Sequence, residues 1–183
     1  IVLVTGVQTC ALPIYADIVF DTIDFLDLSA IVALHDECKK QRKHIISALA
    51  IGWGAGCIYF PPDQKCTFRQ IFSLPDEGSV DQYQYAKTFS KVIDRLKEQL
   101  DPTVLNAVGK ALLVMDDGKP CPASQVSPGA YAVGAFAGTL IVRILSGLPV
   151  LHAPDLMLID MQKSLTSNSL NLQIGRASCR ERV

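Results

Sequence analysis

The sequence lacks any excess of basic charge. Its 183 residues contain 17 Lys and Arg against 18 Asp and Glu, which gives a formal net charge of −1. A nucleic-acid surface requires Lys and Arg gathered on one face of a domain. We therefore expect no nucleic-acid partner.

Paired cysteines are also missing. The central part of the chain holds Cys38, Cys57, Cys66 and Cys121 at irregular spacings, and no two of them form a CxxC pair. This pattern excludes a disulfide framework and favours a reducing cytosol as the location of the protein. His35, His44 and His152 show no metal-ligand spacing either, so ordinary core or surface histidines are expected.

A membrane span is not predicted, although Gly129 to Leu145 is apolar nearly all round. Its uncharged stretch before Arg143 is shorter than the ~20 residues that cross a bilayer, and no flanking charge belt follows. We expect a buried core helix, with Gly134 and Gly138 spaced for close helix packing.

The two ends of the chain differ in character from the rest. Val4 to Ile14 and Ile174 to Val183 look like translations of the two adapter oligonucleotides of short-read sequencing, one at each end of an insert. Such segments are excluded from fold reasoning, so residues 1–14 and 174–183 are set aside as adapter-derived. Residues 15–173 are then expected to be a mildly acidic internal fragment.

This fragment begins with a strand, a helix and a second strand. Ala16 to Phe20 is an apolar run, and the positions 28, 31, 32, 35 and 38 recur at helical spacing behind Asp27 or Ser29 as the N-cap. His44 to Ala50 reads as the second strand, and this order predicts a parallel pair with a right-handed connection. The fold class is therefore α/β with a Rossmann-like sheet and flanking helices.

Two carboxylates follow the first strand. Asp21 and Asp24 lie where that run ends and the helical pattern begins. In an open α/β sheet ligands bind at the carboxyl ends of the strands, so Asp24 is the first candidate functional residue.

The rest of the chain supplies further elements. Gly52 to Gly56 is expected to turn the chain into a third strand, Cys57 to Phe60, and Leu156 to Asp160 reads as a closing strand. Between them, two amphipathic stripes separated by Pro102 predict a pair of helices that form an insertion.

The order of these motifs resembles the E1-like activating enzymes of the ThiF, MoeB and HesA type. In that family a strand ends in Asp-x-Thr-Asp-Asn, and a helix, a strand, a Gly-aromatic turn and a strand ending in Phe follow. Here the run stands as Asp21-Thr22-Ile23-Asp24-Phe25, His44 to Ala50, Gly52-Trp53 and Ile58-Tyr59-Phe60. The resemblance divides the fragment into residues 15–74 (second half of the Rossmann domain), 75–118 (helical insertion) and 119–173 (Gly-rich helix and closing strand).

The resemblance implies an adenylyltransferase that binds ATP and magnesium and activates the C-terminal carboxylate of a ubiquitin-like or sulfur-carrier protein. It implies that Asp24 holds the magnesium, that Asp21 either contributes to this site or anchors the strand end, and that Trp53 lies over the adenylate or the carrier tail. It also implies a homodimer. Phe25 replaces the family's Asn, which marks a divergent branch.

Motifs that the family uses to hold ATP would lie upstream of Tyr15, so the fragment alone is expected not to bind ATP. The resemblance makes Cys121, in Lys119-Pro120-Cys121-Pro122, a candidate sulfur-handling or thioester-forming nucleophile. A rigid loop without catalytic function is the alternative. Cys66 matches the first cysteine of the family's zinc-binding CxxC, but Arg69 stands at the partner position, so zinc is not expected.

Two other functions stay open at this point. The protein could be a non-catalytic E1-like subunit that binds a partner, or a nicotinamide-dependent Rossmann oxidoreductase, because a fold does not determine a function.

Overall fold

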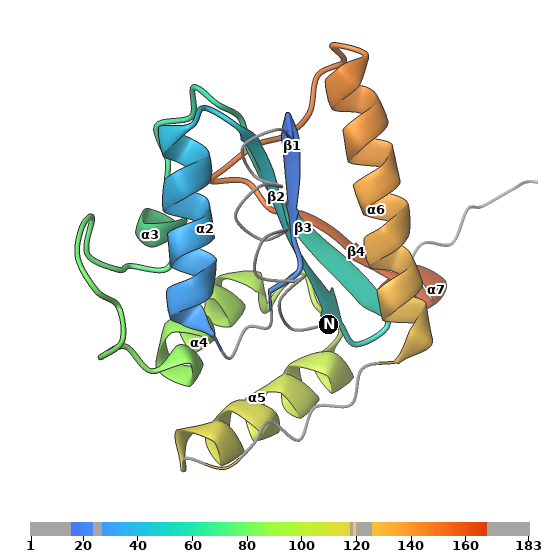
Figure 1. Cartoon of the computed structure of the whole chain (residues 1–183). Coiled ribbons are helices and arrows are strands. Elements are labelled where there is room, and N and C mark those ends of the chain that lie inside the picture. The colour runs from blue at the N-terminus through green and yellow to red at the C-terminus, as the bar shows by residue number, and fades with distance from the viewer. Residues whose placement is uncertain (1–15, 24–26, 118, 120–125, 168–183) are drawn as a thin grey trace, which may run out of the picture.

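The computed structural model describes residues 16–23, 27–117, 119 and 126–167. They form a four-stranded sheet in the order β1-β2-β3-β4 (Figure 1). The strands are Ile18–Asp21 (β1), His44–Ile51 (β2), Gly54–Phe60 (β3) and Met157–Asp160 (β4). β1 is parallel to β2, and β3 is antiparallel to both β2 and β4. This mixed sheet with flanking helices confirms the Rossmann-like α/β prediction.

Helices lie on both faces of the sheet. They are α2 (Leu28–Lys40), α3 (Phe68–Ile71), α4 (Tyr85–Leu96), α5 (Pro102–Asp116), α6 (Ser127–Leu145) and α7 (Met161–Ser167). Figure 1 shows α2 and α3 on one side of the sheet, α6 on the other, and α5 below its lower edge. The two helices predicted around Pro102 are found as α4 and α5.

The crossover helix α2 forms as its sequence predicts. Asp27 is the N-cap, and its Oδ1 accepts a hydrogen bond from the Ala30 amide at 2.9 Å. Lys39 and Lys40 lie in the last turn, where positive charge complements the helix dipole. The apolar stripe is buried, and it comprises Leu28, Ile31, Val32, His35 and Cys38.

The third strand begins earlier than predicted. The glycine-rich run was expected to be a turn from Gly52 to Gly56, but only Gly52 and Trp53 form the turn, and β3 starts at Gly54. Gly52 adopts φ +54°, which a glycine reaches without strain. A Cβ on Gly54 would overlap the carbonyl oxygen of Ile159 on β4. The glycine at 54 therefore permits close strand pairing and does not mark a turn.

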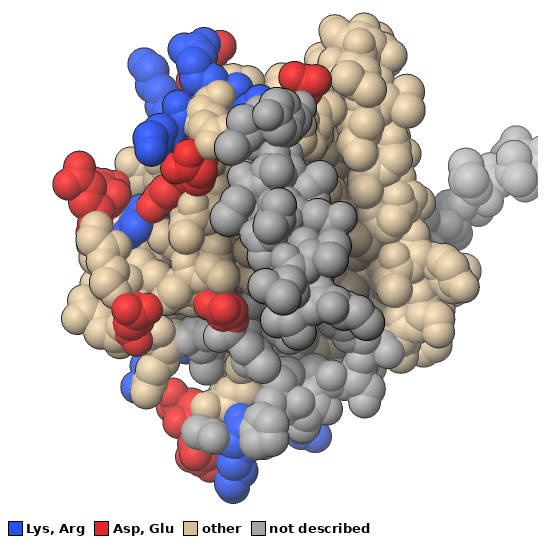
Figure 2. All heavy atoms as spheres, in the orientation of Figure 1, with Lys and Arg blue, Asp and Glu red and all other residues tan. Residues whose placement is uncertain are grey.

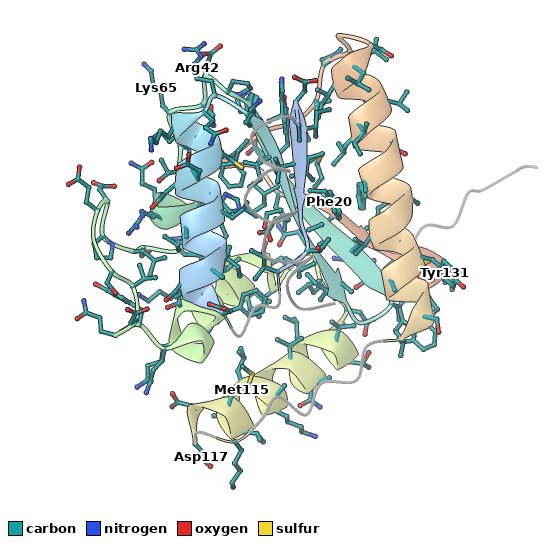
Figure 3. All side chains as sticks on the ribbon, in the orientation of Figure 1. Phe20, Arg42, Lys65, Met115, Asp117 and Tyr131 are labelled. Carbon is teal, nitrogen blue, oxygen red and sulfur yellow. The ribbon has the colours of Figure 1, made fainter. Side chains whose placement is uncertain are left out.

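The prediction of a buried core helix at α6 is wrong. Only Gly129 and Leu140 are buried in it, while Tyr131 is 80% exposed and points away from the sheet (Figure 3). One stripe of α6 packs on β2 and β3 against a cluster that includes Phe20. The visible outer surface of α6 carries no charge cluster (Figure 2). An apolar composition thus did not imply burial on all sides, because α6 is covered on one side only within the described residues.

The predicted close packing at Gly134 and Gly138 is not found among the described residues. A Cβ at either position would meet nothing within 4 Å. By length and composition Ser127–Leu145 could also cross a membrane, with 11% of its most apolar window buried. Helices that pack on a sheet can have the same length and apolar composition, and α6 packs here on β2 and β3.

Arg69 fastens the loop after β3 to α2. The guanidinium is buried and binds both carboxylate oxygens of Asp36, with Nη2 and Oδ2 2.7 Å apart. It also donates to the carbonyl oxygens of Pro75 and Gly78 at 2.9 and 3.0 Å. The short helix α3, which sequence reasoning missed, positions Arg69 and begins with a capping box of Thr67 and Gln70.

Replacing Arg69 is therefore expected to destabilise the fold. Arg69→Met removes the charged donors of two carbonyl oxygens, and we expect a loss of about 2–3 kcal/mol in the free energy of unfolding measured by urea titration. Arg42→Met is the matched control, because Arg42 pairs with Asp63 on the surface, where ion pairs contribute about 0–1 kcal/mol. Equal losses in the two variants would contradict the role assigned to Arg69.

His44 is expected to make stability depend on pH. Its Nδ1 lies 2.5 Å from the Tyr59 hydroxyl, and burial lowers the pKa of the imidazole below its usual value. The unfolded chain therefore binds a proton at His44 more readily than the folded chain does. The contribution of neutral His44 to the free energy of unfolding is complete above the unfolded pKa of about 6.5, and it is lost as the pH falls towards the folded pKa. Urea titrations should show the advantage of the native chain over His44→Gln shrinking from about pH 7.5 to 5. An advantage that is constant or grows over this range would count against the assignment.

Candidate functional site

The carboxyl ends of three strands meet at one edge of the sheet. β1 is parallel to β2, and β4 runs in the same direction because β3 is antiparallel to both of its neighbours. Asp21, Ile51 and Asp160 are the last residues of these strands. This edge, at the bottom of Figure 1, is where ligands bind in open α/β sheets.

Asp21 is held firmly at the tip of β1. Its side chain is 4% exposed, and Oδ1 accepts a hydrogen bond from the Ile23 amide at 3.0 Å. Oδ2 lies 3.3 Å from His35 Nε2 and also accepts from Ser47 Oγ at 3.3 Å. The carboxylate therefore has partners from β1, α2 and β2. This is the geometry of the strand-end anchor that the sequence left as one of two roles for Asp21.

The predicted magnesium ligand, Asp24, lies outside the described residues, as do Phe25 and Leu26. The described chain on either side is fixed by carboxylates. Asp21 binds the Ile23 amide on one side, and Asp27 caps α2 on the other. The described residues that flank Asp24 in the sequence, Ile23 and Asp27, thus each take part in a hydrogen bond between a carboxylate and a backbone amide.

The hairpin of β2 and β3 extends past the tip of β1. Asp21 pairs with Ser47, and β2 continues four residues further to Ile51, which is about 13 Å at the rise of a strand. Gly52 and Trp53 form the turn at its end, and the Trp53 side chain is 45% exposed. The structure thus places Trp53 at the same sheet edge as Asp21, and its contact with a nucleotide or carrier tail stays a prediction.

The starts of α5, α6 and α7 lie against the same edge of the sheet. A Cβ at Gly129, in the first turn of α6, would lie 2.6 Å from the Gly52 carbonyl oxygen and 3.2 Å from that of Gly54. Glycine at this position lets the start of α6 approach the hairpin. Asp160 at the end of β4 accepts hydrogen bonds from the backbone amides of Asp101 and Lys163 at 2.9 and 3.2 Å. Asp160 therefore ties the starts of α5 and α7 to the sheet.

Two cysteines, Cys38 and Cys57, are buried in the core. Cys57 is fully buried in β3, and burial raises the pKa of its thiol to about 12. Desolvation likewise raises the pKa of the buried Cys38 thiol to about 11. Neither thiol is set up as a nucleophile, because the reactive form is the thiolate. The candidate nucleophile Cys121 lies outside the described residues.

Among the residues that the structure describes, no three His, Cys, Asp or Glu side chains gather into a metal site. Cys66 is half-buried, and Arg69 at the predicted partner position is bound to Asp36. A carboxylate such as Asp24 is the kind of oxygen ligand that magnesium prefers.

Comparison with known families gives the identity of the domain. The sequence model of the ThiF family matches residues 10–181. The chain belongs to the ThiF family. The match covers the whole of residues 15–173 and confirms the resemblance drawn from the strand-end Asp-Thr-Ile-Asp motif. No curated protein sequence matches the chain.

Sequence reasoning missed the buried hydrogen bonds around Asp21 in this ThiF-family domain. His35 was expected to be an ordinary histidine, and it is indeed buried and paired. The signal that could have found the pair is its position on the apolar stripe of α2, where a polar side chain needs a buried partner. Asp21, at the end of the strand that α2 covers, was the available acceptor.

Proposed function

We propose that this chain is part of an ATP-dependent adenylyltransferase that activates the C-terminal carboxylate of a ubiquitin-like or sulfur-carrier protein. ThiF-family proteins are generally adenylyltransferases that use ATP and magnesium. The observation that carries the proposal is the buried carboxylate of Asp21, which fixes the end of β1 at the ligand-binding edge of the sheet, three residues before Asp24 in the sequence.

The proposed reaction joins the carrier to AMP. A carboxylate oxygen of the carrier attacks the α-phosphorus of ATP, the bond from that phosphorus to the bridging oxygen breaks, and pyrophosphate leaves. Magnesium would neutralise charge on the phosphates. Asp24 would hold that ion, the anchored turn would fix its place, and Trp53 would cover the adenylate or the carrier tail.

Exchange between ATP and labelled pyrophosphate tests this function. The protein, together with any coding sequence that precedes Tyr15, should incorporate label into ATP only when magnesium and its carrier are present. No exchange with any candidate carrier, combined with NADH binding, would overturn the proposal in favour of an oxidoreductase. No exchange and no NADH binding, with stable capture of a second E1-like subunit, would favour the non-catalytic partner.

The homodimer expected from the sequence stays a prediction. The outward residues of α6, including Tyr131 and Leu145, form an exposed apolar surface that a second copy could contact. The role of Cys121 in a later thioester or sulfur-transfer step likewise stays a prediction.

A further inference from the structure

We infer that His35 and Ser47 are positioning residues for the turn that leads to Asp24, and that they act through the buried carboxylate of Asp21. The inference concerns the path of the chain at Ile23, and only its consequence for magnesium rests on the proposed function.

Three elements converge on one carboxylate. Asp21 ends β1, His35 lies on the inner stripe of α2, and Ser47 is the register partner of Asp21 on β2. Their exposed fractions are 4, 5 and 8%. A buried carboxylate is costly unless donors satisfy it, and here His35 Nε2 and Ser47 Oγ both lie 3.3 Å from Oδ2.

The orientation of His35 is itself fixed. Its ring meets Phe60 edge-on with a centroid distance of 5.0 Å, and it lies 4.4 Å from the ring of Phe68. These contacts direct the imidazole towards Asp21. Because β3 and α3 supply the two phenyl rings, the position of His35 is set by the core and not by the turn.

The other carboxylate oxygen of Asp21 holds the backbone that follows β1. Oδ1 accepts the Ile23 amide two residues on, an Asx-type turn that sets the direction of the backbone. Asp24 is the next residue in the sequence. If Asp21 rotates, the Ile23 amide loses its acceptor, so the donors on Oδ2 control the backbone at Ile23.

A purely structural core would not need this arrangement. The neighbouring positions on the same stripe of α2, Ile31, Val32 and Cys38, fill the core with apolar or weakly polar side chains. Burying an ion with its donors is often no more stabilising than apolar packing of the same volume. The meeting of three buried polar side chains at the tip of β1 therefore indicates a role in positioning the backbone at Ile23.

Amide hydrogen exchange on the full chain tests the inference without any activity assay. In His35→Leu, the Ile23 amide should exchange at least about tenfold faster relative to the Ile46 amide, because Asp21 loses a donor to a charged group. Ile46 is fully buried on β2 and reports global opening. His35→Gln, which retains a donor, should restore part of the protection, and Ser47→Ala should give a smaller change in the same direction.

Ile31→Val is the matched control, because Ile31 is buried on the same helix face and Asp21 has no hydrogen bond to it. It should change both amides equally. If His35→Leu also changes Ile23 and Ile46 in step, the inference is overturned. Should His35→Leu fail to fold, Ser47→Ala decides in the same way.

Magnesium dependence supplies a second readout in the protein that supports ATP–pyrophosphate exchange. The His35 and Ser47 variants should raise the magnesium concentration for half-maximal exchange several-fold, with a smaller change in the rate at saturating magnesium. If the Ile23 amide exchanges its hydrogen faster in the variants but the magnesium requirement is unchanged, the positioning role of His35 and Ser47 is overturned. If the protein shows no ATP–pyrophosphate exchange at all, but the Ile23 amide still exchanges its hydrogen faster in the variants, the proposed function is wrong. The role of His35 and Ser47 in fixing the backbone at Ile23 is then still supported.

Discussion

Asp24→Ala is expected to lower ATP–pyrophosphate exchange by about 10³-fold or more. Loss of the carboxylate would remove the proposed magnesium ligand, and charge stabilisation by a positioned group of this kind is commonly equivalent to 10²–10³-fold or more in rate. The loss should appear at saturating carrier, because the binding surface for the carrier is unchanged. Initial rates of label incorporation measure it.

Asp17→Ala is the control for this prediction. Asp17 precedes β1 at the opposite end of the strand and is exposed, so its loss removes a similar charge from the other edge of the sheet. Its exchange rate should stay within about twofold of the native protein, as expected for a surface substitution. An Asp24→Ala protein that retains exchange within tenfold of native would exclude Asp24 as the metal ligand.

Gly54→Ala is expected to cost about 3 kcal/mol in the free energy of unfolding or to prevent folding. The added Cβ would overlap the backbone oxygen of Ile159, and neither strand can move away without breaking the β3–β4 pairing. Urea titration, or the soluble yield if the variant does not fold, measures the effect.

Gly109→Ala is the matched control with the opposite sign. Gly109 lies within α5, and a Cβ there would meet nothing within 4 Å. Alanine is favoured over glycine in a helix by about 0.8–1 kcal/mol, so this variant should be more stable than the native chain. A Gly54→Ala protein as stable as Gly109→Ala would contradict the close approach of β3 and β4.

The first half of the fold could be predicted because its signals are local. The apolar run of β1, the stripe and cap of α2 and the apolar run of β2 each follow from short-range periodicity, and a parallel pair requires the crossover between them. The structure has these elements close to the predicted boundaries.

Errors arose where the sequence signal has two physical meanings. Glycine marks both turns and close strand contacts, so the sequence predicts that β3 starts at Cys57, three residues after its start at Gly54 in the structure. An all-round apolar composition fits a helix covered on both sides or a helix with an unpaired face, and the exposure of Tyr131 shows that α6 is the second kind. The four-residue helix α3 is too short for periodicity to reveal.

The candidate site shows a similar division. The strand-end carboxylates were identified from order along the chain, which is local information. The hydrogen bonds of Asp21 join residues 14 and 26 positions apart, and such pairs depend on how α2 and β2 fold back on β1. The role of His35 therefore became visible only in three dimensions.

The central claim is that a carrier carboxylate attacks the α-phosphate of ATP. Its most direct test uses a carrier whose C-terminal carboxylate is labelled with ¹⁸O, with the active protein, ATP, magnesium and an amine or thiol acceptor. When the acceptor attacks the carbonyl carbon of the acyl adenylate, AMP leaves with one carboxylate oxygen. We predict one ¹⁸O atom in the AMP by mass spectrometry. AMP without the label, formed alongside a modified carrier, would contradict the account.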